Sequence, residues 1–284
     1  VSPTVIIGLG GSGVKSLSRL KWRLRNYYKT ASLGKETPEA RDAEVNRFMK
    51  RLAFVAVDTM SFDGILEEDP EGGRYIQREL TRDEEYIEVG GFNPGDYITD
   101  QYRASVDLQR WWDDSYNPPH AFINDGAKRV RSLGRLALYN GRQKVRTAIS
   151  RAITQVNEVY TREVEQGKVD PANLVNQVEV FIFSGTCGGT GSGMVLDIIN
   201  MCYSEVKATG KLPTINLILV MPGIYVRAAI NREGGETLAK AYQANAYAFF
   251  KELSYMLSDP QYFHGMILDA TSQGNTGRAP NPGW

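Results

Sequence analysis

The alternation of short apolar runs with longer helix-like stretches is the feature of this sequence that most restricts its fold. Apolar runs of strand length, each bounded by turn residues, recur at residues 4–8, 52–57, 178–184, 215–221 and 265–268. Helical patterns occupy residues 13–28, 132–166, 190–207 and 236–257. Strands that alternate with helices are typical of parallel sheets. The sequence therefore predicts an α/β fold, with a doubly wound, mostly parallel sheet and helices on both faces.

The length of the chain suits one large domain. With 284 residues, we expect this domain to span residues 1–270 and a loop-like tail to occupy residues 271–284. Residues 30–51, with Pro38 in the first turn of a helix, are expected to be an insertion. Residues 60–125 are rich in glycine, proline and acidic residues, so we expect a second insertion of loops and short helices without a further strand.

Composition excludes several classes of protein. The 33 basic and 33 acidic residues balance, which argues against a nucleic-acid-binding or membrane-surface protein. No apolar run approaches the ~18 residues of a membrane span, so no membrane insertion is expected, and no signal peptide is visible. Two cysteines, Cys187 and Cys202, and two histidines, His120 and His264, leave little for a disulfide framework or a metal cluster. We expect a cytoplasmic protein.

The first glycine-rich segment, residues 8–13, follows the first predicted strand and opens a helix. Its glycines allow backbone N–H groups to face an anion, and the helix N-terminus adds roughly half a positive charge. The pattern fits G-x-G-x-x-G, but Asp58 lies 45 residues beyond Gly13, whereas a dinucleotide site has its acid about 20 residues on. A Walker A motif would have Lys and then Ser or Thr directly after Gly13, but Val14 and Lys15 occupy these positions, so the segment does not match that motif. We call residues 8–13 the first loop.

A second glycine-rich segment, residues 185–193, repeats this strand-to-helix context. It holds five glycines in nine residues, with the hydroxyls of Thr190 and Ser192 between them. Such a backbone can wrap consecutive phosphates, so two segments of this kind in one sheet predict a nucleotide site. Cys187 lies near the helix N-terminus, which lowers thiol pKa, although packing is favoured over catalysis for it. We call residues 185–193 the second loop.

These segments resemble the tubulin/FtsZ superfamily over nearly the whole chain. Residues 188–193 match the signature Gly-Gly-Thr-Gly-Ser-Gly, and residues 10–13 resemble the first phosphate loop of that family. Gly126-Ala127, followed by Gly134-Arg135, is similar to the FtsZ stretch in which a Gly-Ala phosphate loop precedes a helix. We call residues 126–131 the third loop. In general pattern, the sequence is most similar to the bacterial tubulin-like proteins of large multidomain chains.

The resemblance implies a tubulin/FtsZ-like GTPase domain with a GTP or GDP site at the C-terminal edge of the sheet. The residues that it places around the nucleotide are Gly10, Gly11, Ser12, Gly13, Asp58, Gly126, Ala127, Lys128, Arg131, Gly188, Gly189, Thr190, Gly191, Ser192 and Gly193. Residues 221–223 resemble the loop that leads to the ribose, Glu233 is the expected ribose contact and Asn275 is the nearest candidate for reading the base. Mg²⁺ is possible, although Met60 replaces an acid and no metal site made by protein ligands is expected.

A basic segment supports a phosphate ligand. Residues 126–157 contain eight Lys or Arg residues and no acid. Because a triphosphate carries about four negative charges, we expect Lys128, Arg129 or Arg131 to meet it. We expect the other basic residues to form a solvated face or a contact with the acidic segment 58–125 of a neighbouring subunit.

The resemblance further implies a protein that self-associates head-to-tail into filaments and hydrolyses GTP with carboxylates from a neighbouring subunit. The expected Gly-x-x-Asn-x-Asp-x-x-Asp pattern is not found in these 284 residues, so the tail would lead to a second domain that carries it. This chain would then bind GTP without efficient hydrolysis. Two alternatives stay open: a non-hydrolysing, nucleotide-gated scaffold of a larger assembly, and a Rossmann oxidoreductase that uses the first loop alone.

Overall fold

A computed structural model describes most of the chain. It covers residues 2–31, 37–65, 70–101, 105–113, 115–118, 123, 126–170, 174–231 and 234–258. The predicted strand 265–268, the tail 271–284 and the residues His120, Glu233, His264 and Asn275 lie outside the described residues.

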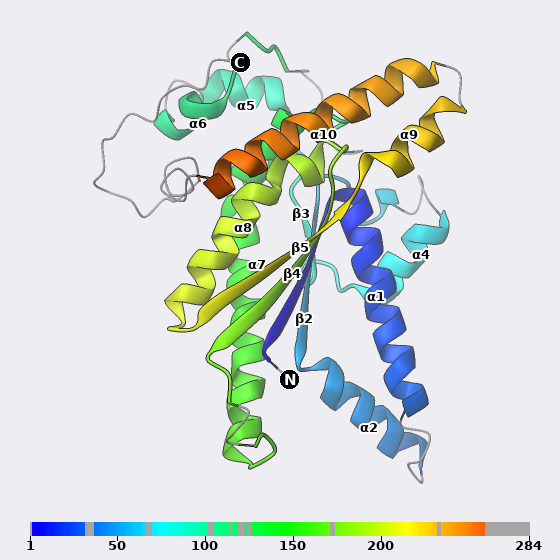
Figure 1. Ribbon diagram of the computed structural model, residues 1–284, viewed down its shortest axis with the longest axis vertical. Coiled ribbons are helices and arrows are strands. Elements are labelled where there is room, and N and C mark those ends of the chain that lie inside the picture. The colour runs from blue at the N-terminus through cyan, green and yellow to red at the C-terminus, as the bar shows by residue number, and fades with distance from the viewer. Residues whose placement is uncertain are drawn as a thin grey trace.

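In the described residues, five parallel strands form the central sheet (Figure 1). They are β1 (Thr4–Leu9), β2 (Leu52–Asp58), β3 (Tyr86–Glu88), β4 (Gln177–Gly185) and β5 (Leu212–Val220), in the order β3-β2-β1-β4-β5. From β1 the chain proceeds outward to β3 and then returns to β4 on the other side of β1. β1 and β4 therefore flank the switch point of a doubly wound sheet, where α/β folds place their ligands. The predicted fold class is confirmed.

Helices cover both faces of the sheet (Figure 1). One face carries α1 (Gly10–Ala31), α2 (Pro38–Met49) and α4 (Pro70–Glu79), and the other carries α7 (Arg131–Glu165) and α8 (Thr190–Ala208). Toward the edge where the strands end lie α5 (Pro94–Gln101), α6 (Val106–Trp111), α9 (Pro222–Ile230) and α10 (Gly235–Ser258). The four predicted long helices and the four predicted strands within the described ranges agree with these bounds to within three residues. No helix of the described chain is long and apolar enough to span a membrane.

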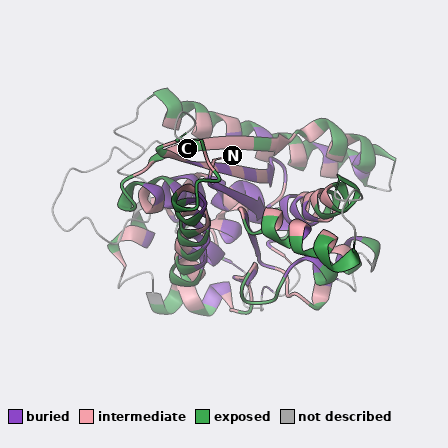
Figure 2. Cartoon of the chain, turned by 90° about the horizontal axis from the view of Figure 1, so that it is seen from below, coloured by how far each residue is buried: buried purple, intermediate pink, exposed green. Residues whose placement is uncertain are grey.

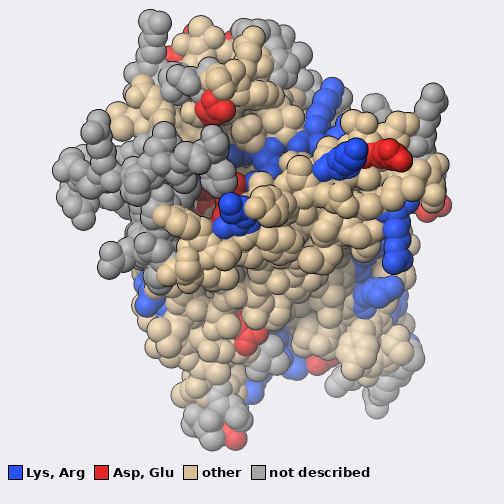
Figure 3. Space-filling view, turned by 45° about the horizontal axis from the view of Figure 1, so that its top comes forward, with Lys and Arg blue, Asp and Glu red and all other residues tan. Residues whose placement is uncertain are grey.

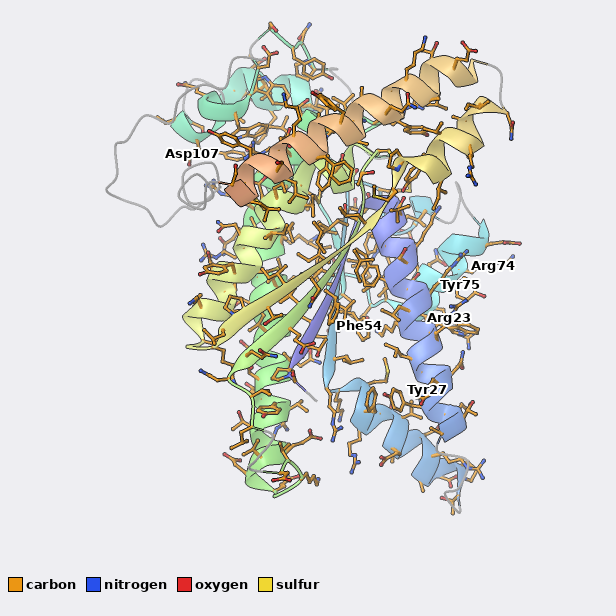
Figure 4. All side chains as sticks on the ribbon, in the orientation of Figure 1. Arg23, Tyr27, Phe54, Arg74, Tyr75 and Asp107 are labelled. Carbon is orange, nitrogen blue, oxygen red and sulfur yellow. The ribbon has the colours of Figure 1, made fainter. Side chains whose placement is uncertain are left out.

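The sheet separates two apolar cores. Figure 2 shows its buried strands in the interior of the chain. Alternate residues of a strand point to opposite faces, so Val55 of β2 joins the core under α7 and α8, while Phe54 joins the core under α1. On the outer side of this second core, Tyr75 of α4 meets Trp22 of α1 edge-on, with ring centroids 5.7 Å apart (Figure 4). Lys21, on the buried face of α1, pairs with Glu85 at 2.6 Å.

Two elements differ from the sequence-based expectations. The expectation that residues 60–125 add no strand is wrong, because Tyr86, Ile87 and Glu88 pair in parallel with the end of β2. Three residues are too few for an apolar alternation to stand out. Residues 221–223 were expected to be a loop, but Met221 caps α9, and Pro222 and Gly223 lie in its first turn.

Close packing of helix against strand depends on a glycine of the first loop. A Cβ atom on Gly13 would lie 2.2 Å from the carbonyl oxygen of Phe183 in β4. α1 can therefore begin directly against the backbone of the neighbouring strand, which brings its N-terminus to the switch point.

We predict that Gly13→Ala lowers the free energy of unfolding by about 1–3 kcal/mol, because the added methyl forces backbone atoms apart. Gly223→Ala is the matched control, since a Cβ on Gly223 has no neighbour within 4 Å. The control should retain the wild-type stability or gain slightly. Urea denaturation of the three proteins measures the difference, and equal midpoints for Gly13→Ala and wild type would show that this close approach is not required.

Candidate anion-binding site

The first and second loops touch each other at the switch point. A Cβ on Gly10 would lie 2.7 Å from the backbone nitrogen of Gly191, and a Cβ on Gly191 would lie 2.6 Å from the carbonyl oxygen of Leu9. Gly10 also has a φ of +63°, a backbone conformation that side chains disfavour. Glycines therefore allow the two loops to pack backbone against backbone.

The third loop lies against the second. A Cβ on Gly189 would come within 2.8 Å of the carbonyl oxygen of Ala127, and a Cβ on Gly134 within 2.2 Å of that of Gly189. The segment after β2 joins them, because the buried hydroxyls of Thr59 and Thr190 share a hydrogen bond of 2.6 Å. The structure thus brings the three loops and the segment after β2 into contact, while the role of each predicted site residue stays a prediction.

Three helices begin in these contacting loops. The N-termini of α1, α7 and α8 carry backbone N–H groups without intrahelical partners and the positive end of each helix dipole. The residues before α7 and α8, Val130 and Gly189, supply no side-chain cap. An anion is the natural ligand of such an arrangement. Figure 3 turns this edge forward and shows Lys and Arg side chains around it.

Two loop glycines have open space at their Cβ positions, as judged from the described residues. A Cβ on Gly188 would have no neighbour within 4 Å, and one on Gly11 would meet only Oδ2 of Asp58, at 4.0 Å. At both positions the missing side chain leaves the backbone accessible to a ligand. The first and second loops each contribute one such position. We call the region where these two loops meet the cradle.

Asp58 is a buried carboxyl group beside this cradle. Its side chain is 3 % exposed, and Oδ1 accepts hydrogen bonds from the backbone nitrogens of Thr59 at 2.7 Å and Met60 at 3.4 Å. Burial raises the pKa of Asp58 to about 6, although these hydrogen bonds and the charge of Lys15 lower it. Asp58 can therefore gain or lose a proton close to neutral pH.

The basic residues of the third loop have unusual backbone geometry. Lys128 and Arg129 adopt φ values of 44° and 69°, a region that few residues other than glycine occupy. The backbone nitrogen of Val130 donates to the carbonyl oxygen of Ala127 at 2.8 Å and closes the turn. Both side chains are exposed. Strain of this kind is typical of functional loops.

The basic residues of α7 have partners within the chain. Arg131 pairs with Glu252 of α10, Arg135 with the buried Asp197, Lys144 with Asp83, Arg146 with Glu205, and Arg151 with the carbonyl oxygen of Glu84. The interpretation of Arg135 as part of a solvated face is wrong: its guanidinium is bidentate on Asp197 at 2.9 and 3.0 Å and lies over Trp111. That Arg131 contacts phosphate stays a prediction.

The expectation that the helix N-terminus lowers the thiol pKa of Cys187 is wrong, whereas the packing role favoured for it agrees with its burial. Its side chain is fully buried, and burial raises the pKa of its thiol, where a helix N-terminus alone would lower it. Desolvation of the thiolate outweighs the helix dipole here. Cys187 is therefore a packing residue of the second loop.

Two further residues at the site were missed by sequence reasoning. Nδ2 of Asn245 in α10 donates to the carbonyl oxygens of Arg129 at 2.8 Å and Cys187 at 2.9 Å. The hydroxyl of Tyr225 in α9 shares a hydrogen bond of 2.5 Å with Oγ of Ser12. The sequence does hint at Asn245, because the helical period of α10 places this polar residue among inward-facing apolar ones. No local pattern indicates a role for Tyr225.

The site suits a phosphate better than a metal ion held by protein ligands alone. No group of three His, Cys, Asp or Glu side chains that could hold a metal occurs in the described residues. Asp58 is adjacent to the cradle, but Met60 offers no carboxylate beside it. Any Mg²⁺ here would take most of its ligands from phosphate and water, with Asp58 the protein group in reach.

A surface hollow of about 540 Å³ lies elsewhere, along the exposed side of α7. Polar side chains line it, including Gln143, Thr147 and Thr154, together with Glu205 of α8. None of the predicted site residues contributes to this hollow.

A family model described as "Tubulin like" matches residues 5–279. The chain belongs to the tubulin-like family. Among solved structures, this tubulin-like chain is similar to CetZ from Methanosaeta thermophila, at 14 % identity and a TM-score of 0.34, over 90 % of this chain and 54 % of that one. It is also similar to CetZ2 from Haloferax volcanii, described as a GTPγS-bound protofilament, at 16 % identity and a TM-score of 0.31, over 95 % and 60 %. The chain thus spans less than two thirds of either protein. No curated protein sequence matches it.

We predict that Asp58→Asn stabilises the protein at neutral pH and removes a pH dependence. The folded state holds the Asp58 proton up to about pH 6, whereas the usual pKa is 3.8. Wild type therefore loses stability as pH rises from about 4 to 6, by roughly 3 kcal/mol at most. The variant lacks this loss. Urea denaturation between about pH 4 and 7 measures both, and a difference that stays constant with pH would contradict the assignment.

Proposed function

We propose that this tubulin-like chain binds a guanine nucleotide, GTP or GDP, with the phosphates between the first and second loops. The observation that carries the proposal is the contact of Gly10 with Gly191 at the switch point, which places two glycine loops and their helix N-termini side by side. Each of these two loops also has one glycine with open space at its Cβ position, Gly11 in the first and Gly188 in the second.

Family membership supports the guanine nucleotide. The signature in residues 188–193 and the tubulin-like match over residues 5–279 both favour GTP over other anions. In this proposal, backbone N–H groups of the first and second loops bind the α- and β-phosphates, and Lys128 of the strained third loop approaches the γ-phosphate. The alternative of an oxidoreductase that binds its cofactor with the first loop alone is disfavoured, because it gives no role to the second loop, which packs tightly against the first.

Assembly and hydrolysis are the further parts of the proposal. A head-to-tail filament would supply the carboxylates that activate the attacking water, as the family resemblance implies. Asp58, the carboxyl group beside Gly11, is already held by two backbone N–H groups. We therefore expect the isolated chain to hydrolyse GTP slowly. The alternative function for the same site is a scaffold whose interactions are controlled by bound nucleotide and which does not hydrolyse it.

The sharpest test fills the open side of the cradle. We predict that Gly188→Val weakens GTP and GDP binding at least about tenfold without changing stability in the absence of nucleotide, because the added side chain occupies ligand space and its Cβ has no described protein atom within 4 Å. Gly191→Val is unsuitable, since its side chain would strike Leu9 and disturb the fold. Ala241→Val, on the exposed face of α10, is the control.

Thermal unfolding with and without nucleotide measures this effect. At about a hundred times the dissociation constant, GTP or GDP should stabilise wild type and Ala241→Val by about 2.7 kcal/mol, and ATP should do less. A tenfold weaker Gly188→Val variant should gain only about 1.4 kcal/mol at the same concentration, and a weaker one less. The proposal fails if millimolar guanine nucleotide does not shift wild type, or if Gly188→Val responds as wild type does.

A further inference from the structure

The α9–α10 pair is connected to all three loops. Tyr225 of α9 bonds to Ser12 in the first loop, and Asn245 of α10 bonds to Cys187 in the second. Asn245 also bonds to Arg129 in the third loop. The two helices pack closely on each other and lie at the edge of the sheet where the strands end (Figure 1).

Asn245 is the central connection. Its amide nitrogen carries two hydrogens, so it can donate to Arg129 and Cys187 at the same time. On the same face of α10, Ala246 is 3 % exposed and Phe249 is fully buried in the core under α7 and α8. Because this packing fixes α10, the side chain of Asn245 sets the distance between two backbone carbonyls of different loops.

A charged pair repeats this connection. The guanidinium of Arg131 binds both carboxylate oxygens of Glu252 in α10 and donates to the carbonyl oxygen of Ser192 at 3.1 Å. The two side chains are 13 % and 32 % exposed. A bidentate, partly buried pair of this kind holds a defined geometry. Arg131 therefore connects the third loop to the start of α8 and to α10.

We propose that α9 and α10 form a clasp that sets the spacing of the three loops, with Asn245 as its main positioning residue. The effect of this clasp on nucleotide binding rests on the proposed function. If the third loop separated from the second, the protein would bind GTP less tightly, and binding of GDP, which lacks the γ-phosphate, would be affected less. In the same scheme, Arg131 acts through the loops that it connects.

The chain contains a reporter for the clasp that does not require nucleotide. Cys187, whose carbonyl oxygen accepts from Asn245, is fully buried, and the second cysteine, Cys202, is fully buried in α8. Loss of the Asn245 hydrogen bonds should open the second loop locally and expose the Cys187 thiol. Cys202 lies within α8 and is not bonded to Asn245, so its thiol should stay buried and protected from a thiol reagent.

We predict that Asn245→Ala and Asn245→Asp each speed the labelling of Cys187 by a thiol reagent about tenfold, because both variants lack the amide donor. Labelling of Cys202 should be unchanged, and Gln243→Ala, on the exposed face of α10, should label as wild type does. Peptide mass spectrometry reads the two cysteines separately. Wild-type labelling of Cys187 in both Asn245 variants, or equal acceleration of both cysteines, would overturn the clasp.

A second measurement tests the link to nucleotide. Asn245→Ala should weaken GTP more than GDP, by thermal shift, while Gln243→Ala leaves the ratio of the two affinities unchanged. An unchanged ratio in Asn245→Ala would overturn that link. If wild type binds no guanine nucleotide, the proposed function fails while the labelling rates still decide the clasp, so the two failures are distinguishable.

Discussion

The backbone contact between the first and second loops is the constraint on which the rest of this structure depends. This contact requires glycine at positions 10 and 191, because a Cβ on Gly10 or Gly191 would overlap the backbone of the other loop. Gly13 allows α1 to begin directly against β4. With these contacts, the N-termini of α1, α7 and α8 begin in loops that touch one another at the switch point of the sheet, and the positive end of a helix dipole lies at each.

The site is held together at a cost to local stability. Burial of Asp58 disfavours its charged form, and the backbone at Lys128 and Arg129 occupies a region that suits glycine better. The two cores that enclose the sheet provide the rigid frame that maintains this geometry. α10 adds Asn245 and Glu252, which secure the second and third loops from outside the sheet.

Local patterns in the sequence predicted most of the fold and both glycine loops, because strand and helix periodicity and glycine spacing are local signals. β3 was missed since three residues carry too little pattern. The predicted direction of the pKa shift of the Cys187 thiol was wrong, because burial raises the pKa more than the helix dipole lowers it. Burial is a property of the tertiary structure and leaves no local pattern. Asn245 contacts residues 58 and 116 positions away, and the partner of Arg135 is 62 positions away, so no local pattern could pair them.

A crystal structure of this chain with GTPγS would test the central claim most directly. The account predicts phosphate oxygens within hydrogen-bond distance of backbone N–H groups from both the first and the second loop, next to Gly11 and Gly188. Phosphates that contact only one of these loops, or that occupy the polar hollow along α7, would contradict it.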